Sequence, residues 1–277
     1  MQTIGGQAVI EGVLMLSKKK IAVSVRKEDG HIETKVEERH PLATKFKDII
    51  FFRGIISLIE MLYIGTKALM WSTDQSLDEE EKLTTWQMTL TLLISFGIGI
   101  ALFIILPLYL AKLVSDQHVI FNLVDGVLRV IIFIGYLLLI SMMKDIQRVF
   151  QYHGAEHMAV HCYEAKKPLT TKNVRSFTTL HPRCGTAFLI IVLILSIILF
   201  SFIWSDNWFL KFAFRILLIP LIASVSYEIL KFSAKHQHTI LFKLLITPGL
   251  WFQKITTKKP DDKQIEVAIV SLKAVLK

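Results

Sequence analysis

Residues 127–164, VLRVIIFIGYLLLISMMKDIQRVFQYHGAEHMAVHCYE, decide the fold of this chain, because an apolar run passes here directly into a polar run rich in histidine. Val127 to Met143 carries Arg129 as its only charge and approaches the length that crosses a bilayer as a helix. Asp145 and Arg148 follow at i, i+3 spacing, typical of a pair on a helix surface. The sequence therefore predicts one helix that leaves the membrane and keeps its helical phase as a cytoplasmic extension.

Three histidines share one face of this predicted extension. His153, His157 and His161 are spaced i, i+4, i+8, with Glu164 on the same face and Glu156 beside it. His153-x-x-Glu156-His157 fits the H-x-x-E-H pattern of the inverted zincins, in which two histidines bind zinc and the glutamate acts on water. We therefore expect a divalent metal, Zn²⁺ by preference, with Glu156 as the catalytic group.

One ion cannot use all three histidines of this face, because a rise of 1.5 Å per residue separates the first and last Cα atoms by about 12 Å. It would use either His153 with His157 or His157 with His161. The nearest suppliers of a third ligand are His181 and Cys184, some twenty residues further on. The alternative is that these histidines only form hydrogen bonds or contact lipid head groups, since a five-residue match also arises by chance.

Composition places the chain in a membrane. Of its 277 residues 53% are hydrophobic, and the mean hydropathy of +0.51 is too high for an ordinary soluble domain. Two cysteines, Cys162 and Cys184, are too few for a disulfide scaffold and are expected to be reduced. The first residues lack the pattern of a cleaved signal peptide, so insertion is expected to start from an internal segment.

Four stretches approach the roughly twenty residues that a membrane helix requires. They are Trp86 to Leu110, Val127 to Met143, Gly185 to Trp204, and Trp208 to Tyr227. A fifth apolar stretch, Asp48 to Trp71, carries Arg53, Glu60 and Lys67 at sevenfold spacing. This charged stripe favours a helix that lies in the membrane interface or packs under other helices.

The basic residues predict the orientation. Residues 1–85 contain twelve Lys and Arg, 144–183 seven and 228–277 nine, whereas the connections 111–126 and 205–207 contain only Lys112. By the positive-inside rule, both termini and the histidine-rich region lie in the cytoplasm.

Charged residues inside the apolar stretches need partners or an escape to water. Arg129 could reach outward along its helix, and Asp125 with Arg129 at i, i+4 fits a pair on the helix surface. Arg215 lies about two turns into the last predicted span and is a candidate for a functional role. Glu228, at the cytoplasmic end of that span, is a further candidate ligand.

The two ends of the chain are polar and are expected to lie outside the bilayer. Gln7 to Leu16, Ile21 to Lys27 and Ile32 to Glu38 predict a small antiparallel sheet, with a turn at residues 28–30. His236 to Lys254 is basic and amphipathic, is interrupted at Pro248-Gly249, and is expected to lie in the interface. A last amphipathic helix begins at Asp261 and needs a partner surface.

The predicted fold class is an α-helical integral membrane protein with four membrane helices, interfacial helices and a cytoplasmic β-sheet. It divides into six regions: 1–48, β-rich; 49–85, an interfacial helix and an acidic linker at Asp78 to Lys82; 86–143, two membrane helices; 144–184, the His/Cys-rich helix and loop; 185–227, a second membrane hairpin; and 228–277, basic amphipathic helices.

The chain resembles the DUF1385 (YqhQ-like) family of prokaryotic integral membrane proteins nearly from end to end. The resemblance rests on GGQAVIEGV (5–13), Arg53-Gly54, Asp125-Gly126, RVF (148–150), YHGAEH (152–157), HCYE (161–164), HPRCGT (181–186), SYE (226–228), PGL (248–250) and QIEVA (264–268). It implies a plasma-membrane location and an activity as a metal-dependent enzyme.

Two functional hypotheses follow. In the first, the chain is a metal-dependent hydrolase at the cytoplasmic face, with ligands drawn from His153, His157, His161, His181 and Cys184, or with Cys184 itself as a nucleophile at the start of the third predicted span. In the second, it is a non-catalytic assembly factor or scaffold for membrane-protein biogenesis. The net charge of +9 would then meet anionic lipid, the translocon, the ribosome or another membrane protein, with no DNA partner.

Overall fold

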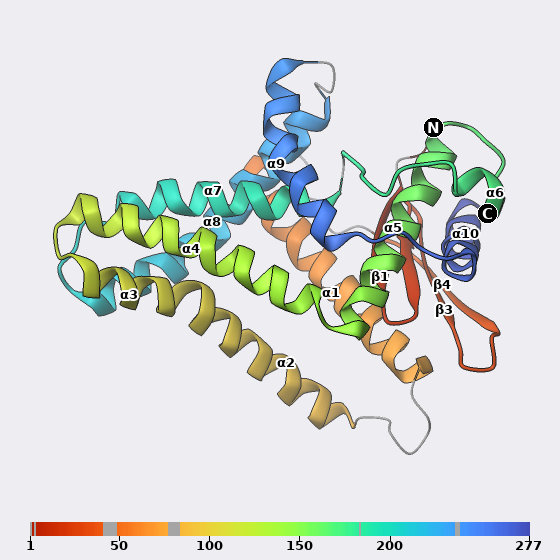
Figure 1. Ribbon diagram of the computed structural model, residues 1–277, viewed down its shortest axis with the longest axis horizontal. Coiled ribbons are helices and arrows are strands. Elements are labelled where there is room, and N and C mark those ends of the chain that lie inside the picture. Colours follow the sequence, from red (N-terminus) through yellow and green to blue (C-terminus); the bar gives the residue numbers. More distant parts are fainter. Residues whose placement is uncertain (1, 3, 41–48, 77–83, 183, 236–238) are drawn as a thin grey trace.

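A computed structural model describes residues 2, 4–40, 49–76, 84–182, 184–235 and 239–277 (Figure 1). A bundle of long apolar helices lies at one end, and a sheet with three helices, α5, α6 and α10, lies at the other. We call this second part, residues 4–40, 144–174 and 261–277, the head. The expected acidic linker at 78–82 lies outside the described residues.

The sheet is an antiparallel meander in the order β1-β2-β3-β4, formed by Gly5–Val9, Gly12–Leu16, Lys20–Arg26 and Ile32–Glu38. The predicted small sheet is confirmed, but the single run from Gln7 to Leu16 was wrong. A tight turn at Ile10-Glu11 divides it into two paired strands, and Glu11 takes a φ of 50° to close that turn. Gly30, with a φ of +86°, closes the predicted turn between β3 and β4.

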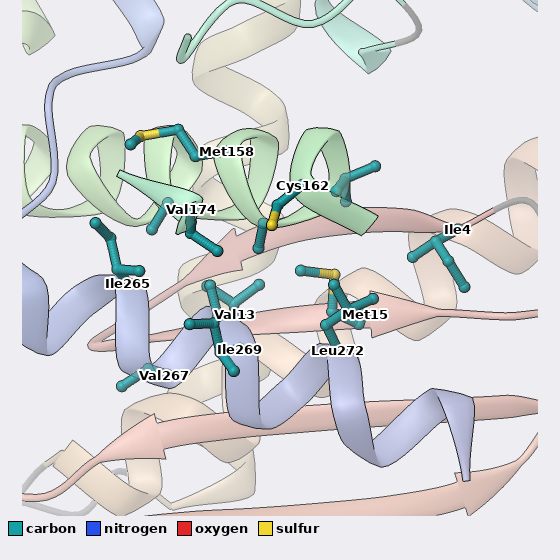
Figure 2. Packing of buried hydrophobic residues seen from close by; sticks show 14 of the residues in the cluster. Ile4, Val13, Met15, Met158, Cys162, Val174, Ile265, Val267, Ile269 and Leu272 are labelled. Atoms are coloured by element: carbon teal, nitrogen blue, oxygen red, sulfur yellow. The ribbon is translucent and has the colours of Figure 1, made fainter. Parts of the chain in front are cut away.

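Both faces of this sheet are covered. On β2, Val13 and Met15 point to α5 (Lys144–Glu164) and α10 (Asp262–Leu276), whereas Leu14 and Leu16 point to the opposite face against α1 (Ile50–Ser76). Figure 2 shows the first of these clusters, in which α5, β2 and α10 enclose one apolar core. Burial on two faces explains why β2 reads as a continuous apolar run.

The last predicted helix is confirmed as α10. Asp261 caps it by accepting the amide hydrogen of Gln264, whose side chain accepts in return from the Asp261 amide. Ile265 and Leu272 are fully buried against α5 and the sheet, which are the partner surface that the sequence required.

The chain is mostly helical and contains four helices that are long and apolar enough to span a membrane, counted over the described residues. They are Phe52–Ser76 in α1, Trp86–Val114, His118–Ser141 (α4), and Trp208–Phe232 in α8 (Trp208–Lys235). The second comprises α2 (Thr85–Ile100), a π-helical turn (Ala101–Ile105) and α3 (Leu106–Val114). The predicted number agrees, but its membership changes: α7 (Gly185–Ser201) has only 17 residues, and α1 takes its place.

The three charges of α1 explain why its sequence looked interfacial. Arg53 forms two hydrogen bonds of 2.6 and 2.5 Å with Glu228 of α8. Lys67 pairs with Glu37 of β4 at 2.8 Å. Glu60 accepts from Arg39 at 2.9 Å. The stripe therefore faces other parts of the protein. Glu228 was predicted to be a further candidate ligand, but its carboxylate is bound to Arg53 instead.

The predicted continuity between the second span and the histidine helix was wrong. Helix α4 ends at Ser141, and Met143 has an extended backbone with φ −73° and ψ 132° before α5 begins at Lys144. The Gln147 amide donates to the carbonyls of Ser141 and Met142, which the break leaves without helical partners. Arg148 pairs with Glu11 of the β1–β2 turn rather than with Asp145.

Asp125 and Arg129 lie inside the bundle, which corrects the prediction of a surface pair and of an Arg129 that reaches outward. Both residues are at most 4% exposed. The Asp125 carboxylate accepts from Arg129 at 3.0 Å and from Arg215 of α8 at 2.9 Å. Arg129 also donates to the Phe103 carbonyl at 3.1 Å. One carboxylate thus joins α4 to α8, and this structural contact accounts for the charge of Arg215.

The prediction that Pro248-Gly249 interrupts the C-terminal amphipathic segment was wrong. Helix α9 runs from Ile240 to Thr256 with Pro248 inside it. A Cβ atom on Gly249 would lie 2.9 Å from Cα of Ala187, so the absence of a side chain lets α9 pack closely on α7. Residues 236–238, the start of the predicted segment, lie outside the described residues.

Candidate metal centre

Helix α5 carries the predicted stripe intact. The rings of His153 and His157 lie 4.4 Å apart between centroids, and those of His157 and His181 lie 5.6 Å apart. His181 comes from the segment that joins α6 (Thr171–Val174) to α7, and the Thr179 and Leu180 carbonyls of this segment contact α5. Helix α5 therefore presents its histidines to the loop from which a third ligand was expected.

The first group consists of His153, His157 and Cys184. One ligand atom from each lies within 4.8 Å of the other two, and the His153 Nε2 to Cys184 Sγ distance is 3.3 Å. Cys184 is the N-cap residue of α7, where its sulfur also accepts from the Thr186 amide at 3.5 Å. The start of an apolar helix thereby places a thiol against two imidazoles.

Backbone carbonyls hold both imidazoles of this group. His153 Nδ1 donates to the Thr256 carbonyl at 2.8 Å, and His157 Nδ1 donates to the Thr179 carbonyl at 2.5 Å. A carbonyl only accepts, so Nδ1 carries a proton in both rings, and the neutral form of each ring has its lone pair on Nε2. A metal-ligating histidine typically donates its other ring N–H to a backbone carbonyl or a carboxylate in this way.

Glu156 lies beside the first group and is buried. Its Oε2 is 3.6 Å from His157 Nε2. A Cβ atom on Gly6 of β1 would lie 2.5 Å from Glu156 Oε1, so the sheet closes over the carboxyl group. Burial raises the pKa of Glu156 against the opposing effect of the His153 and His181 imidazoles.

Burial also keeps two of the imidazoles neutral. It lowers the pKa of His157, against the hydrogen bonds to Cys184 and the Thr179 carbonyl, which favour the protonated ring. It lowers the pKa of His161 in the same way, against the hydrogen bond to the Leu180 carbonyl. A neutral imidazole is the form that binds a metal ion.

The second group consists of His161, Glu164 and His181, whose ligand atoms also lie within 4.8 Å of one another. His181 Nε2 is 3.4 Å from Glu164 Oε2, and His161 Nε2 is 2.8 Å from the Leu180 carbonyl oxygen. The five candidate ligands are thus divided between two groups. His153 and His157 come together with Cys184, as one of the two predicted histidine pairs, whereas His161 and His181 gather around Glu164.

Gln253 of α9 holds the loop that carries His181, a contact that no pattern in the sequence predicts. Its amide accepts from the His181 backbone nitrogen at 2.8 Å and donates to the His181 carbonyl at 2.9 Å, and the side chain is 1% exposed. A buried glutamine that pairs with both backbone groups of one residue fixes that residue in place. Only the packing of α9 against the loop reveals this contact.

The close approach of another segment to α5 at Gly154, next to His153, could have been predicted from the glycine itself. A Cβ atom at this position would lie 2.1 Å from the Lys258 carbonyl oxygen, so the segment after α9 crosses α5 at the glycine. The Lys258 amide donates to the Phe150 carbonyl at 2.9 Å in the same crossing. A glycine between two potential ligands on a helix indicates a close backbone approach.

Known proteins support the resemblance proposed from the sequence. The sequence model of a family described as "Protein of unknown function (DUF1385)" matches residues 49–277. The "Uncharacterized protein YqhQ" of Bacillus subtilis (strain 168) is 36% identical over 295 residues, which cover 99% of this chain and 92% of that protein. No solved structure matches the chain. The chain is therefore a member of the DUF1385 (YqhQ-like) family.

Proposed function

We propose that this chain is a membrane metalloenzyme of the hydrolase class in which His153, His157 and Cys184 bind Zn²⁺. The observation that carries the proposal is the convergence of three ligand atoms, with both imidazoles turned by backbone carbonyls so that Nε2 faces the thiol. A histidine that only filled space in the core would not need its ring orientation fixed toward two other ligands.

The donor set fits the ion. Two ligands of a tetrahedral zinc, bound at about 2.0 and 2.3 Å, lie roughly 3.5 Å from each other. The His153 Nε2 to Cys184 Sγ distance is 3.3 Å. Three protein ligands leave the fourth position open, as in catalytic rather than structural zinc sites.

Glu156 is the residue that moves a proton in this proposal. A bound Zn²⁺ supplies Lewis acidity and lowers the pKa of water toward neutrality. The carboxylate of Glu156, 3.6 Å from the Nε2 of His157, would accept a proton from that water as general base. Its pKa, raised by burial, would make it a stronger base than an exposed carboxylate.

The place of the centre suggests its substrate. Cys184 directly precedes the apolar helix α7, so the centre lies where the bundle meets the head (Figure 1). We propose a peptide or lipid-linked substrate that is presented at the membrane surface. The excess of Lys and Arg in the head and the chain ends supports a cytoplasmic orientation, in contact with anionic head groups of a prokaryotic plasma membrane.

The metal content of full-length protein, purified in detergent without chelator, tests the first step. We expect zinc in the parent protein and in His31→Asn, an exposed histidine of the β3–β4 turn, and its loss from His157→Ala and Cys184→Ser. A metal-free parent protein, or zinc that survives both ligand substitutions, would contradict the site.

Glu156→Gln tests catalysis, because the carboxamide keeps the size of the side chain but cannot accept the proton. We expect this variant to retain zinc and to fail to complement a strain that lacks the gene. If Glu156→Gln and Cys184→Ser both complement fully, the chain acts as the non-catalytic assembly factor instead. Copurification with the ribosome or the translocon would then support that role, for which the charge of +9 is the present argument.

A further inference from the structure

We propose that this protein binds a second transition-metal ion, through His161, Glu164 and His181, beside the centre of His153, His157 and Cys184. The inference rests on the proposed function, because it adds an ion to the same centre. Its ligands are different residues, so it can be tested separately. The second ion would be held by two histidines and one carboxylate, a set that suits Zn²⁺, Mn²⁺ or Fe²⁺.

The pattern of ligands repeats along the helix. The first centre takes two residues one turn apart on α5, His153 and His157, and one residue from the loop, Cys184. The second group takes the next two residues of the same face, His161 and Glu164, and again one residue from the loop. The loop supplies its residues in the reverse order, His181 before Cys184. A helix and a loop that pass each other thus provide two similar sets of three.

The distances of the second group fit ligands of one ion. His181 Nε2 and Glu164 Oε2 are 3.4 Å apart, close to the roughly 3.4 Å that separates two ligands of a tetrahedral ion bound at about 2.0–2.1 Å. The His161 and His181 rings approach to 4.4 Å between centroids. Two imidazoles this close to one carboxylate oxygen share one small space.

The surroundings fix these side chains as they do in the first centre. The Leu180 carbonyl accepts from His161 Nε2, which leaves Nδ1 with the lone pair, and the His161 ring stacks on Phe177 with an interplanar angle of 6°. Gln253 binds both backbone groups of His181. His181 is 5% exposed, so its imidazole is withdrawn from competing water.

The two groups are neighbours, because the rings of His157 and His181 are 5.6 Å apart. Two-metal centres use two ions to hold the attacking and the leaving oxygen of one substrate. The second ion would therefore extend the substrate class to one with two oxygens to be held, as in a phosphodiester or a carboxyl ester. His161, which lies outside the H-x-x-E-H pattern, would then be a ligand of the second ion.

Cobalt binding tests the proposal, because a thiolate ligand gives Co²⁺ an intense charge-transfer absorption that nitrogen and oxygen ligands do not give. Chelator-stripped full-length protein in detergent is dialysed against Co²⁺, and bound cobalt is counted per chain. We expect two equivalents in the parent and in His31→Asn. Glu164→Gln should bind one equivalent and keep the thiolate absorption. Cys184→Ser should bind one equivalent and lose it.

The outcomes separate the two sites. Glu164→Gln replaces a partly exposed side chain by one of equal size, so loss of the whole fold is not expected, and His161→Asn repeats the measurement at a second ligand. One equivalent in the parent that is lost only in Cys184→Ser would overturn the second site and leave the proposed function intact. One equivalent that is lost only in Glu164→Gln would overturn the first site and support the second. No bound cobalt would overturn both.

Discussion

Gly154 lies where a backbone segment crosses the helix of the candidate metal centre. Its hydrogen lies under the Lys258 carbonyl, and two residues before Lys258 the Thr256 carbonyl accepts from His153. In Gly154→Ala the new Cβ would lie 2.1 Å from that oxygen, so the segment after α9 must move. We expect a loss of about 1–3 kcal/mol of stability and weaker zinc binding, measured by thermal unfolding and by competition with a chelator.

Gly135 of α4 is the matched control, because no atom lies within 4 Å of a Cβ placed there. Gly135→Ala should leave zinc binding unchanged and the unfolding temperature equal or higher, since alanine favours a helix by roughly 0.5–1 kcal/mol over glycine. Equal zinc affinity in Gly154→Ala and the parent would show that the crossing does not support His153.

Glu156 should limit stability when no metal is bound. Burial raises its pKa, so the folded protein resists ionisation more than the unfolded chain does. The favourable contribution of the protonated carboxyl is fully present below the unfolded pKa of about 4.3 and is lost as the pH rises through the folded value. In chelator-treated protein, Glu156→Gln should therefore unfold at a higher temperature than the parent at pH 8, and the difference should shrink toward pH 4.5. A difference that grows on acidification would contradict this assignment.

At the residue scale, the sequence was informative wherever a local pattern sets the geometry. The spacing of His153, His157 and His161 predicted a shared helical face, because a helix repeats every 3.6 residues. The residues that contact that face could not be predicted from the sequence. Gln253 lies 72 residues after His181 and Thr256 lies 103 residues after His153, and no periodicity connects positions so far apart.

Among the elements, α4 and α8 depend on one buried carboxylate. Asp125 accepts from Arg129 and Arg215, and the Nε atoms of both arginines have no hydrogen-bond partner among the described residues. Asp125→Ala would leave two buried guanidinium groups without their anion. We expect this to cost about 3–5 kcal/mol, measured as loss of folded protein during thermal unfolding in detergent.

Asp206→Ala provides the comparison, since the Asp206 side chain is 96% exposed. Its contact with His118 is a surface pair at 3.5 Å. The substitution should change stability by less than about 1 kcal/mol. If the two alanine variants unfold at the same temperature, the cluster does not join α4 to α8.

The elements themselves were predicted best where the two faces of a segment differ in polarity. Helix α10 was predicted from its cap and its apolar stripe. Strand β2 was merged with β1, because burial of both its faces removed the alternation that marks a strand. The break between α4 and α5 at Met142-Met143 was missed, since neither glycine nor proline marks it. Long-range packing, rather than local propensity, sets that boundary.

For the whole molecule, metal removal should loosen more than the centre. Its ligands come from α5 and from the start of α7, and both helices pack on α9 or on the segment that follows it. A ligand at 100 times its Kd stabilises the folded state by about 2.7 kcal/mol. We expect chelation to lower the unfolding temperature and to expose the loop at 175–182 to protease.

Readdition of Zn²⁺ should restore protease resistance in the parent protein. Cys184→Ser provides the internal control, because chelator should then have a much smaller effect on its cleavage. Equal protection of the parent protein with and without chelator would show that zinc does not contribute to the stability of the folded state.

The crossing of residues 256–258 over α5 also sets the order of events during biosynthesis. The imidazole of His153 is translated 103 residues before the carbonyl that orients it. During that interval α7, α8 and α9 must be made and must enter their places beside the bundle. A growing polypeptide therefore exposes its histidines before their orientation is set, and the proposed centre would acquire its ion only at a late stage of maturation.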